Sequence, residues 1–232
     1  MSRIVPRFRA VLFDWRGTLV QAPTGAWLAR TALGAIGRPN GPAEVRSVLD
    51  QLANCDRAGV DEPVIDIDPE QHRLAFHRWF RTAGIDDELA VAMYATECSP
   101  ELNPLADDAV PVLSALTEAG VRIAVVSDIH VDIRPSFVAQ MVGDGASLAD
   151  LIDGWVLSYE VGAVKPDPVM FCTALDRLGV PAEEALMVGD RGAWDGACTS
   201  LGLTALVLPP LAAVSDGHLR RVLDLVLPGV GS

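Results

Sequence analysis

The sequence has few cysteines, and none of them form a close pair. Cys55, Cys98, Cys172 and Cys198 stand far apart, and no Cys-x-x-Cys pair occurs. Zinc knuckles and redox dithiols use closely spaced cysteines. Neither is therefore indicated, and we expect four buried free thiols.

Basic residues are also scarce. Lys and Arg number 18 against 31 Asp and Glu, which gives a formal net charge of −13 and a pI near 4.6. A chain this acidic repels nucleic acid and anionic membranes. We therefore expect no nucleic-acid partner and no membrane partner, and a phosphate site would need its own local cation.

Long apolar runs are missing as well. No run approaches the roughly eighteen residues that a membrane span requires. The N-terminus carries Arg3, Arg7 and Arg9 but continues directly into a strand-like stretch, not into the apolar region of a signal peptide. We expect a cytoplasmic protein.

What the chain does contain is ample core material, because half of its 232 residues are hydrophobic. Residues 22 to about 100 have helical periodicity interrupted by Gly and Pro. Asp68 followed by Pro69 is a typical helix start, and the stripe with Phe76 and Phe80 is expected to pack in a core. The expected helices cover residues 27–36, 43–58, 69–83 and 86–95.

The rest of the chain alternates strand and helix patterns, which is typical of a parallel sheet. The expected strands cover residues 10–13, 121–126, 155–157, 186–188 and 205–208, and a helix is expected over 194–201. This favours an α/β fold with a Rossmann-like three-layer parallel sheet core and an inserted all-helical cap. We assign residues 1–21 and 101–232 to the core and residues 22–100 to the cap.

Reactive side chains follow these strands. Asp14, Ser127 and Asp190 come directly after three of them, Lys165 lies one loop after a fourth, and Asp195 is five residues beyond Asp190. The carboxyl ends of parallel strands meet at one edge of a sheet, where α/β folds bind their ligands. A carboxylate held there can act as a nucleophile or as a ligand of a hard cation.

As a set, these segments resemble the motifs of the haloacid dehalogenase-like (HAD) hydrolase superfamily. The four segments occur in the order of the family, and the resemblance covers the whole expected core. They are Asp14-Trp15-Arg16-Gly17-Thr18, Val125-Val126-Ser127-Asp128, Lys165-Pro166-Asp167-Pro168, and Val188-Gly189-Asp190 with Asp195.

The resemblance implies phosphoryl transfer through an aspartyl-phosphate on Asp14. Mg²⁺ would be held by Asp14, the backbone carbonyl of Arg16 and Asp190, which are oxygen ligands suited to that ion. Ser127 and Lys165 would hold the phosphoryl oxygens, which need charge dispersal during transfer. Asp195 would position Lys165 or a metal-bound water.

The sequence departs from the family at Arg16. The phosphatases of the family carry a second Asp two residues after the nucleophile, and it serves as the general acid and base. A guanidinium with a pKa above 12 cannot exchange a proton near neutral pH. Because acid–base groups contribute about 10²–10⁴ in rate, hydrolysis of ordinary alkyl phosphates should be impaired.

Three interpretations follow. In the favoured one, the protein is a Mg²⁺-dependent phosphohydrolase in which Arg16 contacts a substrate anion, and His130 is the nearest replacement acid by sequence. In the second, Asp14 displaces halide from a 2-halo acid, a step that needs no acid. In the third, Arg16 is an internal counter-ion to Asp14 and Asp190, and the fold serves as a binding or regulatory module.

The expected substrate is a small, phosphorylated molecule. Trp15, Asp128 and His130 are the candidate substrate contacts in the core. His72 and His77 are about 140° apart around a helix and are not expected to share a metal. The protein is expected to be a monomer or homodimer, in which residues 222–230 either pair or form a final core helix. The cap candidates are Trp27, Arg30, His72, His77 and Trp79.

Overall fold

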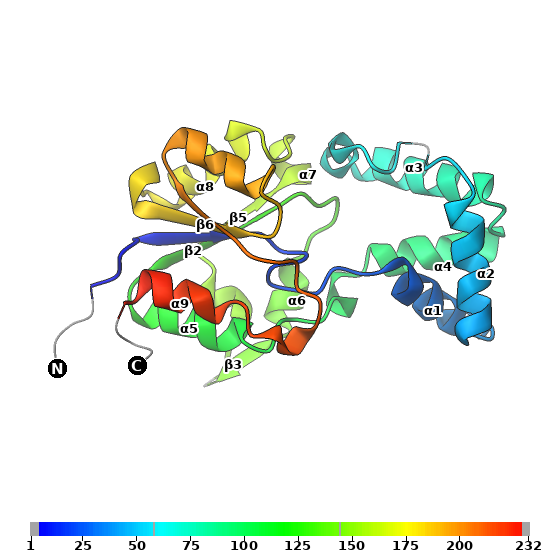
Figure 1. Cartoon of the computed structure of the whole chain (residues 1–232), viewed down its shortest axis with the longest axis horizontal. Helices are drawn as coiled ribbons and strands as arrows, with labels where there is room; N and C mark the ends of the chain where they lie inside the picture. The colour runs from blue at the N-terminus through cyan, green and yellow to red at the C-terminus, as the bar shows by residue number, and fades with distance from the viewer. Residues whose placement is uncertain (1–4, 58, 144, 229–232) are drawn as a thin grey trace.

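A computed structural model describes residues 5–57, 59–143 and 145–228 of the chain (Figure 1). Within these residues, five parallel strands form one sheet in the order β5-β2-β1-β6-β7. The predicted α/β, Rossmann-like core is confirmed. The strands are β1 (Ala10–Phe13), β2 (Arg122–Ser127), β5 (Gly154–Leu157), β6 (Ala185–Gly189) and β7 (Thr204–Val207).

The register of the central strands places their carboxyl ends at one edge. Phe13, the last residue of β1, pairs with Val125 of β2 and with Val188 of β6. The next residue, Asp14, donates its backbone N–H to the carbonyl of Val188 at 2.9 Å. Residues that follow β1, β2 and β6 therefore converge.

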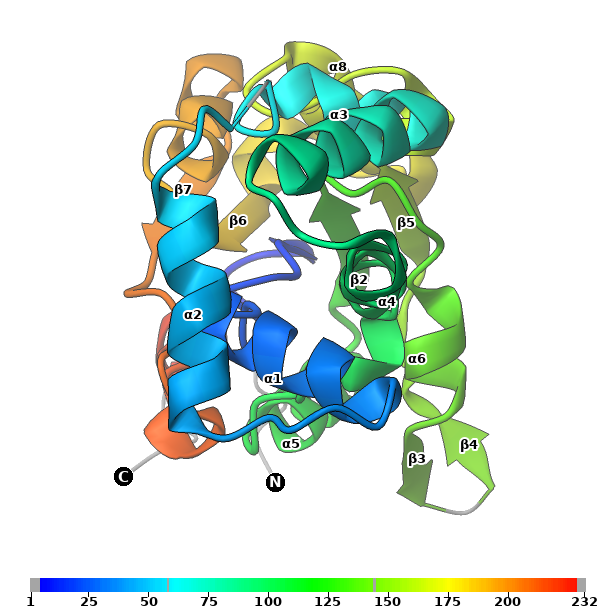
Figure 2. The ribbon, with the colours of Figure 1, turned by 90° about the vertical axis from the view of Figure 1, so that its right-hand side faces the viewer.

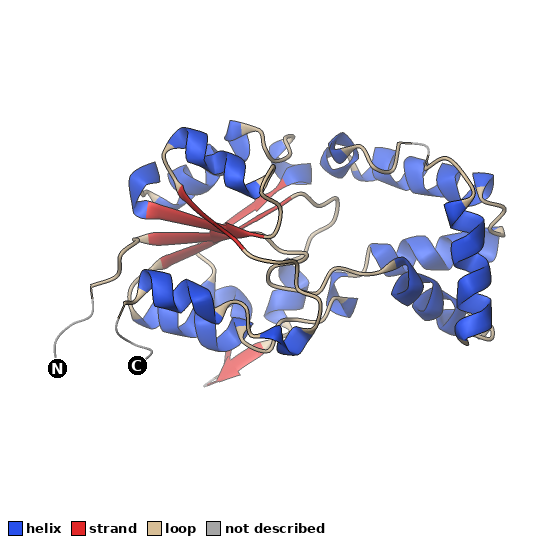
Figure 3. Cartoon of the chain, in the orientation of Figure 1, coloured by secondary structure: helices blue, strands red, loops and turns tan. Residues whose placement is uncertain are grey.

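Alternate residues of the strands pack on opposite faces of the sheet. Val11 and Phe13 of β1 join the apolar cluster under α5 (Ala109–Glu118) and α9 (Arg220–Val226), whereas Ala10 and Leu12 face α8 (Pro168–Leu178). Figure 3 shows helices on both sides of the strands. Burial on both faces explains why the central strands β1 and β6 are continuously apolar.

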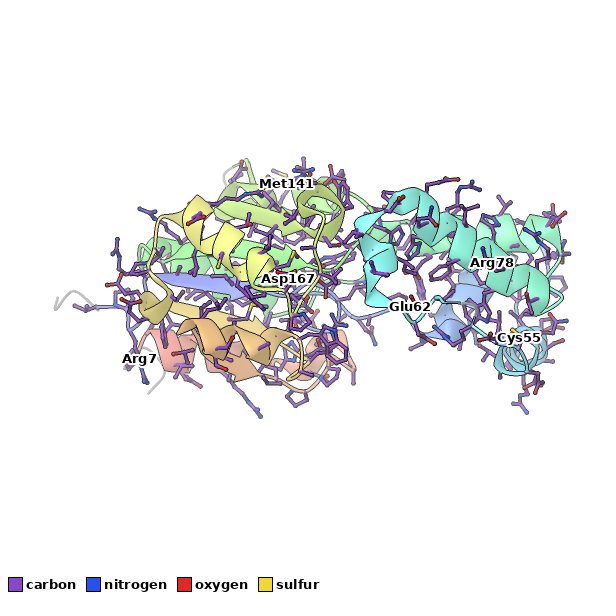
Figure 4. The ribbon with its side chains drawn as sticks, turned by 90° about the horizontal axis from the view of Figure 1, so that it is seen from above. Arg7, Cys55, Glu62, Arg78, Met141 and Asp167 are labelled. Carbon is purple, nitrogen blue, oxygen red and sulfur yellow. The ribbon has the colours of Figure 1, made fainter. Side chains whose placement is uncertain are left out.

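The helices of residues 25–97 lie to one side of the sheet (Figures 1 and 2). They enclose an apolar cluster of their own, with Phe76, Phe80 and Met93 at its centre. In Figure 4 the labelled residues Cys55, Glu62 and Arg78 of this helical segment stand apart from Arg7, Met141 and Asp167. The segment contains α1 (Gly25–Ala35), α2 (Pro42–Ala53), the 3₁₀ turn η1 (Pro63–Ile67), α3 (Pro69–Thr82) and α4 (Asp87–Glu97).

The helix starts follow from local chemistry. The Asp68 carboxylate accepts the backbone N–H groups of Glu70 and Gln71 at 2.9 and 3.1 Å, so the start predicted there is confirmed. Asp86 caps α4 by accepting the N–H of Leu89 at 3.1 Å. These side chains satisfy donors that a helix end leaves unpaired.

Several details differ from the sequence predictions. Residues Asp195–Leu201 form a 3₁₀ helix, η5, because Thr199 and Ser200 donate their hydroxyls to carbonyls three residues back and compete with α-helical bonding. The expected second helix ends at Ala53. Cys172 is exposed, which corrects the expectation of four buried thiols.

Of the two alternatives for residues 222–230, the described part forms a core helix. Val222 and Val226 of α9 are fully buried, while residues 229 and 230 lie outside the described part. Among the described residues, no helix is long and apolar enough to cross a membrane. The sequence did not predict the hairpin of β3 (Met141–Gly143) and β4 (Ala146–Ser147). The remaining elements are short α-helices and 3₁₀ helices: η2 (Pro100–Leu102), α6 (Arg134–Val138), η3 (Leu148–Leu151), α7 (Ser158–Val161), η4 (Ala182–Glu184) and η6 (Val214–Asp216).

Candidate active site

A buried lysine joins two of the expected carboxylates at the sheet edge. The Lys165 ammonium donates to Asp14 Oδ1 at 2.6 Å and to Asp195 Oδ1 at 2.6 Å. Its side chain is 0% exposed, and those of Asp14 and Asp195 are 4% and 1% exposed. Segments 151 and 30 residues apart in the sequence thus meet at one cation.

The charge of Lys165 is maintained by these partners. Burial alone would lower the pKa of the ammonium, but the carboxylates of Asp14 and Asp195 outweigh burial and raise it. Burial raises the pKa of Asp14, and Lys165 works against that rise. Two carboxylates around one ammonium leave negative charge on the group, which favours a further cation.

Asp190 offers that cation a ligand. Its Oδ1 atom is buried without a hydrogen-bond partner among the described residues. Asp14, Asp190 and Asp195 each place one carboxylate oxygen within 4.8 Å of the other two. Burial, followed by repulsion from Asp14 and Asp195, raises the pKa of Asp190 to about 6. An unpartnered oxygen in an acidic group fits a hard cation such as Mg²⁺.

Two glycines make room for these carboxylates. Gly17 has φ +85°, and a Cβ there would lie 2.4 Å from Asp190 Oδ2. A Cβ on Gly189 would lie 2.2 Å from the carboxyl carbon of Asp195. Side chains at either position would displace the acids, so the glycines set the geometry.

The residues after β2 line the same edge. Ser127 is 2% exposed at the end of the strand. Asp128 accepts the backbone N–H of Lys165 at 2.8 Å and the guanidinium of Arg191 at 3.2 Å. Asp128, predicted as a substrate contact, therefore anchors the loop that presents Lys165.

Sequence reasoning missed Arg191. Besides contacting Asp128, its guanidinium lies 5.1 Å from the centre of the Trp194 ring, and its side chain is 42% exposed. Its backbone N–H donates to Asp195 Oδ2 at 2.9 Å. The available signal was its position directly after Asp190 at the end of β6. Arg191 supplies a second, accessible cation beside Lys165.

The comparison with known families agrees with this geometry. Residues 8–197 match the model of the haloacid dehalogenase-like hydrolases. The chain belongs to this family. It is therefore a HAD-like hydrolase, as its motifs predicted.

Relatives of this HAD-like hydrolase include both phosphatases and dehalogenases. The chain is 29% identical to a phosphoglycolate phosphatase of Rhodospirillum rubrum over 227 residues, covering 92% of this chain and 82% of that protein. A HAD phosphatase from Thermococcus onnurineus superposes with a TM-score of 0.59 at 21% identity, covering 94% and 97% of the two chains. A 2-haloacid dehalogenase from Pseudomonas syringae gives 0.61 at 20% identity over 94% and 97%. The two solved structures establish the shared fold, and the curated relative is a phosphatase.

Arg16 of the hydrolase turns away from the carboxylates. Its guanidinium forms an ion pair with the Glu97 carboxylate and donates to the Glu97 carbonyl at 3.0 Å, and its Nε donates to Asn103 Oδ1 at 3.1 Å. Among the described residues Arg16 forms no ion pair with Asp14 or Asp190, which the third interpretation requires. Lys165 fills that role for Asp14, and Arg16 ties the loop after β1 to the end of α4.

The other candidate contacts occupy varied positions. Trp15 is fully buried, and its indole Nε1 has no hydrogen-bond partner among the described residues. His130 is 2% exposed and stacks on His72 with ring centroids 3.3 Å apart. Trp79 is buried in the apolar cluster of the helical segment, whereas Trp27 and His77 are half-buried and Arg30 is exposed.

Proposed function

We propose that this HAD-like hydrolase is a Mg²⁺-dependent phosphohydrolase that acts on a small phosphorylated molecule through an aspartyl-phosphate on Asp14. The observation that carries the proposal is the buried Asp14–Lys165–Asp195 group with the unpartnered oxygen of Asp190 beside it. The similarity to a phosphoglycolate phosphatase supports the reaction class.

The reaction begins with attack of an Asp14 carboxylate oxygen on phosphorus, which breaks the bond to the leaving oxygen. Lys165 and Ser127 hold the phosphoryl oxygens, and Arg191 adds positive charge. Water then attacks the phosphorus of the aspartyl-phosphate and restores the Asp14 carboxylate. Mg²⁺, held by Asp14, Asp190 and the backbone carbonyl of Arg16, would neutralise charge between the nucleophile and the phosphoryl group.

We propose that proton transfer in this enzyme is weak. Arg16 occupies the position of the acid–base residue and is committed to Glu97 and Asn103. The leaving group would take its proton from water, from the substrate or from another residue. Good leaving groups, which need little protonation, should therefore react best.

We further propose that residues 22–100 are a cap that controls access, and that residues 1–21 and 101–232 are the catalytic core. The link from Arg16 to Glu97 supports this division, because it connects the nucleophile loop directly to the end of α4. Substrate selection would then depend on how the helical segment sits over the sheet edge.

Phosphate release from a panel of small phosphate esters tests the proposal. Mg²⁺-dependent turnover is expected for p-nitrophenyl phosphate, and Asp14→Asn should remove it. Halide release from 2-halo acids without metal would contradict the proposal in favour of dehalogenation. The absence of both activities would favour a binding or regulatory module.

The Arg16 substitution supplies a sharper test. Arg16→Asp alone would place a carboxylate beside Glu97, so the informative variant is Arg16→Asp with Glu97→Gln. We expect it to hydrolyse alkyl phosphates faster than Glu97→Gln alone, by up to about 10²-fold. Equal rates would show that position 16 does not limit proton transfer.

A further inference from the structure

Two histidines and a carboxylate meet where the helical segment touches the core. Asp66 comes from η1 and His72 from α3, both in the helical segment, whereas His130 comes from the loop after β2. Figure 1 shows α3 beside α7 of the core at this junction. The three residues each place a possible ligand atom within 4.8 Å of the other two.

The distances match the requirements of one small cation. Asp66 Oδ1 lies 3.5 Å from His130 Nδ1 and 3.8 Å from His72 Nε2. With metal–ligand bonds of about 2.1 Å, neighbouring ligands of a tetrahedral ion lie about 3.4 Å apart. The His72 and His130 rings are stacked, with centroids 3.3 Å apart and planes 12° apart, so one imidazole must turn out of the stack before both nitrogens can bind the same ion.

One of these atoms forms no hydrogen bond. His130 Nδ1 forms no hydrogen bond to any described residue, and the His130 side chain is only 1% exposed. An unpaired nitrogen at such depth costs free energy unless something binds it.

The opposite ring nitrogens have polar neighbours. His72 Nδ1 lies 3.2 Å from the Tyr94 hydroxyl, and His130 Nε2 lies 3.4 Å from Cys98 Sγ. Histidines that bind metals commonly use the second nitrogen in this way, which fixes the ring. Ser158 of α7 donates its hydroxyl to the Asp66 carbonyl at 2.9 Å and holds η1 against the core.

We propose that Asp66, His72 and His130 form a second metal site, selective for a borderline cation of the Zn²⁺ class and separate from the carboxylate site at Asp14 and Asp190. Two imidazoles and one carboxylate match the donor preferences of Zn²⁺, whereas Mg²⁺ favours oxygen ligands. Because the ligands come from both the helical segment and the core, the bound ion acts as a clamp that holds the two together. The inference does not depend on the reaction proposed for Asp14.

Calorimetric titration of the full chain with Zn²⁺ tests the site. Excess Mg²⁺ keeps the carboxylate group occupied, and Co²⁺ absorbance gives a second, spectroscopic measure of nitrogen ligation. One equivalent of Zn²⁺ should bind. His130→Phe and Asp66→Asn should each weaken binding by more than about 100-fold, and Tyr94→Phe by about 10-fold, since loss of a group that orients a ligand costs 10- to 100-fold.

The matched control is His77→Phe, which alters another histidine of α3 that lies against the Tyr94 ring. This variant should bind Zn²⁺ like the wild type. Asp66 is 25% exposed, so Asp66→Asn should fold even if a substitution of the buried histidines does not. Circular dichroism of the metal-free variants verifies folding.

The clamp has its own readout. Zn²⁺ should slow proteolysis in the connections at residues 21–24 and 98–104 in the wild type and leave the rate unchanged in Asp66→Asn. Absence of Zn²⁺ binding under excess Mg²⁺, or equal binding by wild type and Asp66→Asn, would overturn the site. Binding without protection from proteolysis would overturn the clamp.

Discussion

At the scale of single residues, Lys165 is the ion-pair partner of both Asp14 and Asp195. Its ammonium neutralises part of the charge of Asp14 and Asp195 in a place closed to water. A buried ion whose partner is removed is strongly destabilising, because the remaining charge is neither solvated nor paired. The lysine therefore stabilises the fold, and in the proposed reaction it also holds the phosphoryl oxygens.

Lys165→Met should abolish hydrolysis and lower the free energy of unfolding by about 3–5 kcal/mol. Adding Asp14→Asn to Lys165→Met removes one buried, unpaired carboxylate. The free energy of unfolding should rise by about 0.5–3 kcal/mol, and activity should not return. Urea unfolding of the two single variants and the double variant measures the coupling. Strictly additive losses would mean that the two groups do not interact.

The sequence could predict which acids and lysine meet at the sheet edge, but not which residues the arginine side chains contact. Asp14, Lys165, Asp190 and Asp195 follow strand ends, so the topology alone brings them together. The destination of Arg16 depends on Glu97, which is 81 residues away in the sequence. No local pattern records such a contact, and the pairing of Arg191 with Asp128 was missed for the same reason.

At the scale of elements, the turn after β1 requires a residue without a side chain. Gly17 combines a left-handed φ of +85° with close approach to Asp190, whereas Gly37 has a similar φ of +71° and open space around its Cβ position. Substitution of Gly37 therefore tests backbone strain alone, whereas substitution of Gly17 adds a steric clash with Asp190.

Gly17→Ala should therefore lose activity and apparent Mg²⁺ affinity, because the methyl group displaces the Asp190 carboxylate. Gly37→Ala should lose only about 1–2 kcal/mol of stability, the cost of a left-handed residue with a Cβ. Activity and unfolding assays on both variants test this. A Gly17→Ala enzyme with normal activity would show that the position of Asp190 is unimportant.

The start of α4 yields a pH prediction. Asp86 caps this helix and accepts two hydrogen bonds from Arg38, at 2.6 and 2.8 Å, and the Arg38 bonds are the main cause that lowers the pKa of Asp86 to about 2. Since the folded pKa lies below the ordinary value, the ionised form stabilises the fold. That contribution is complete above about pH 4 and disappears as the pH falls through about 2.

Asp86→Ala should cost about 1 kcal/mol near pH 7, which is a typical value for a lost cap with an exposed ion pair. The difference between variant and wild type should vanish toward pH 2. Urea unfolding at several pH values measures it, with Asp87→Ala, which changes the neighbouring acid, as the control. A difference that stays constant with pH would contradict the assigned charge effect.

Element prediction succeeded where burial sets the pattern. The strands β1, β2, β5 and β6 contain apolar runs that are followed directly by Asp14, Ser127, Ser158 and Gly189, and the sequence marks them clearly. The prediction of an α-helix over 194–201 was wrong because hydroxyl side chains redirect the hydrogen bonds of η5. The β3–β4 hairpin was not predicted because its short strands bury little apolar surface.

At the scale of the whole molecule, the charge distribution selects the ligand. A chain with net charge −13 gathers Lys165 and Arg191 at one sheet edge. Asp14, Asp190 and Asp195 outweigh these two cations, so a small anion would bind there together with the Mg²⁺ proposed for the site, while the rest of the surface repels polyanions. The acidic composition and the two cations therefore agree with a small phosphorylated substrate.

The two parts of the molecule are joined beside the site. Arg16 connects the nucleophile loop to Glu97 and Asn103, and Ser158 binds the carbonyl of Asp66. These contacts place the helical segment where its position affects the carboxylate group. Movement between the two parts would alter the site directly.

Mass spectrometry of the acid-quenched enzyme tests the central claim most directly. The protein is mixed with Mg²⁺ and p-nitrophenyl phosphate, quenched during turnover and digested. We expect one phosphoryl group on the peptide that contains Asp14, and none on that peptide in Asp14→Asn. A phosphoryl group on another peptide, or turnover without any phosphorylated peptide, would contradict the account.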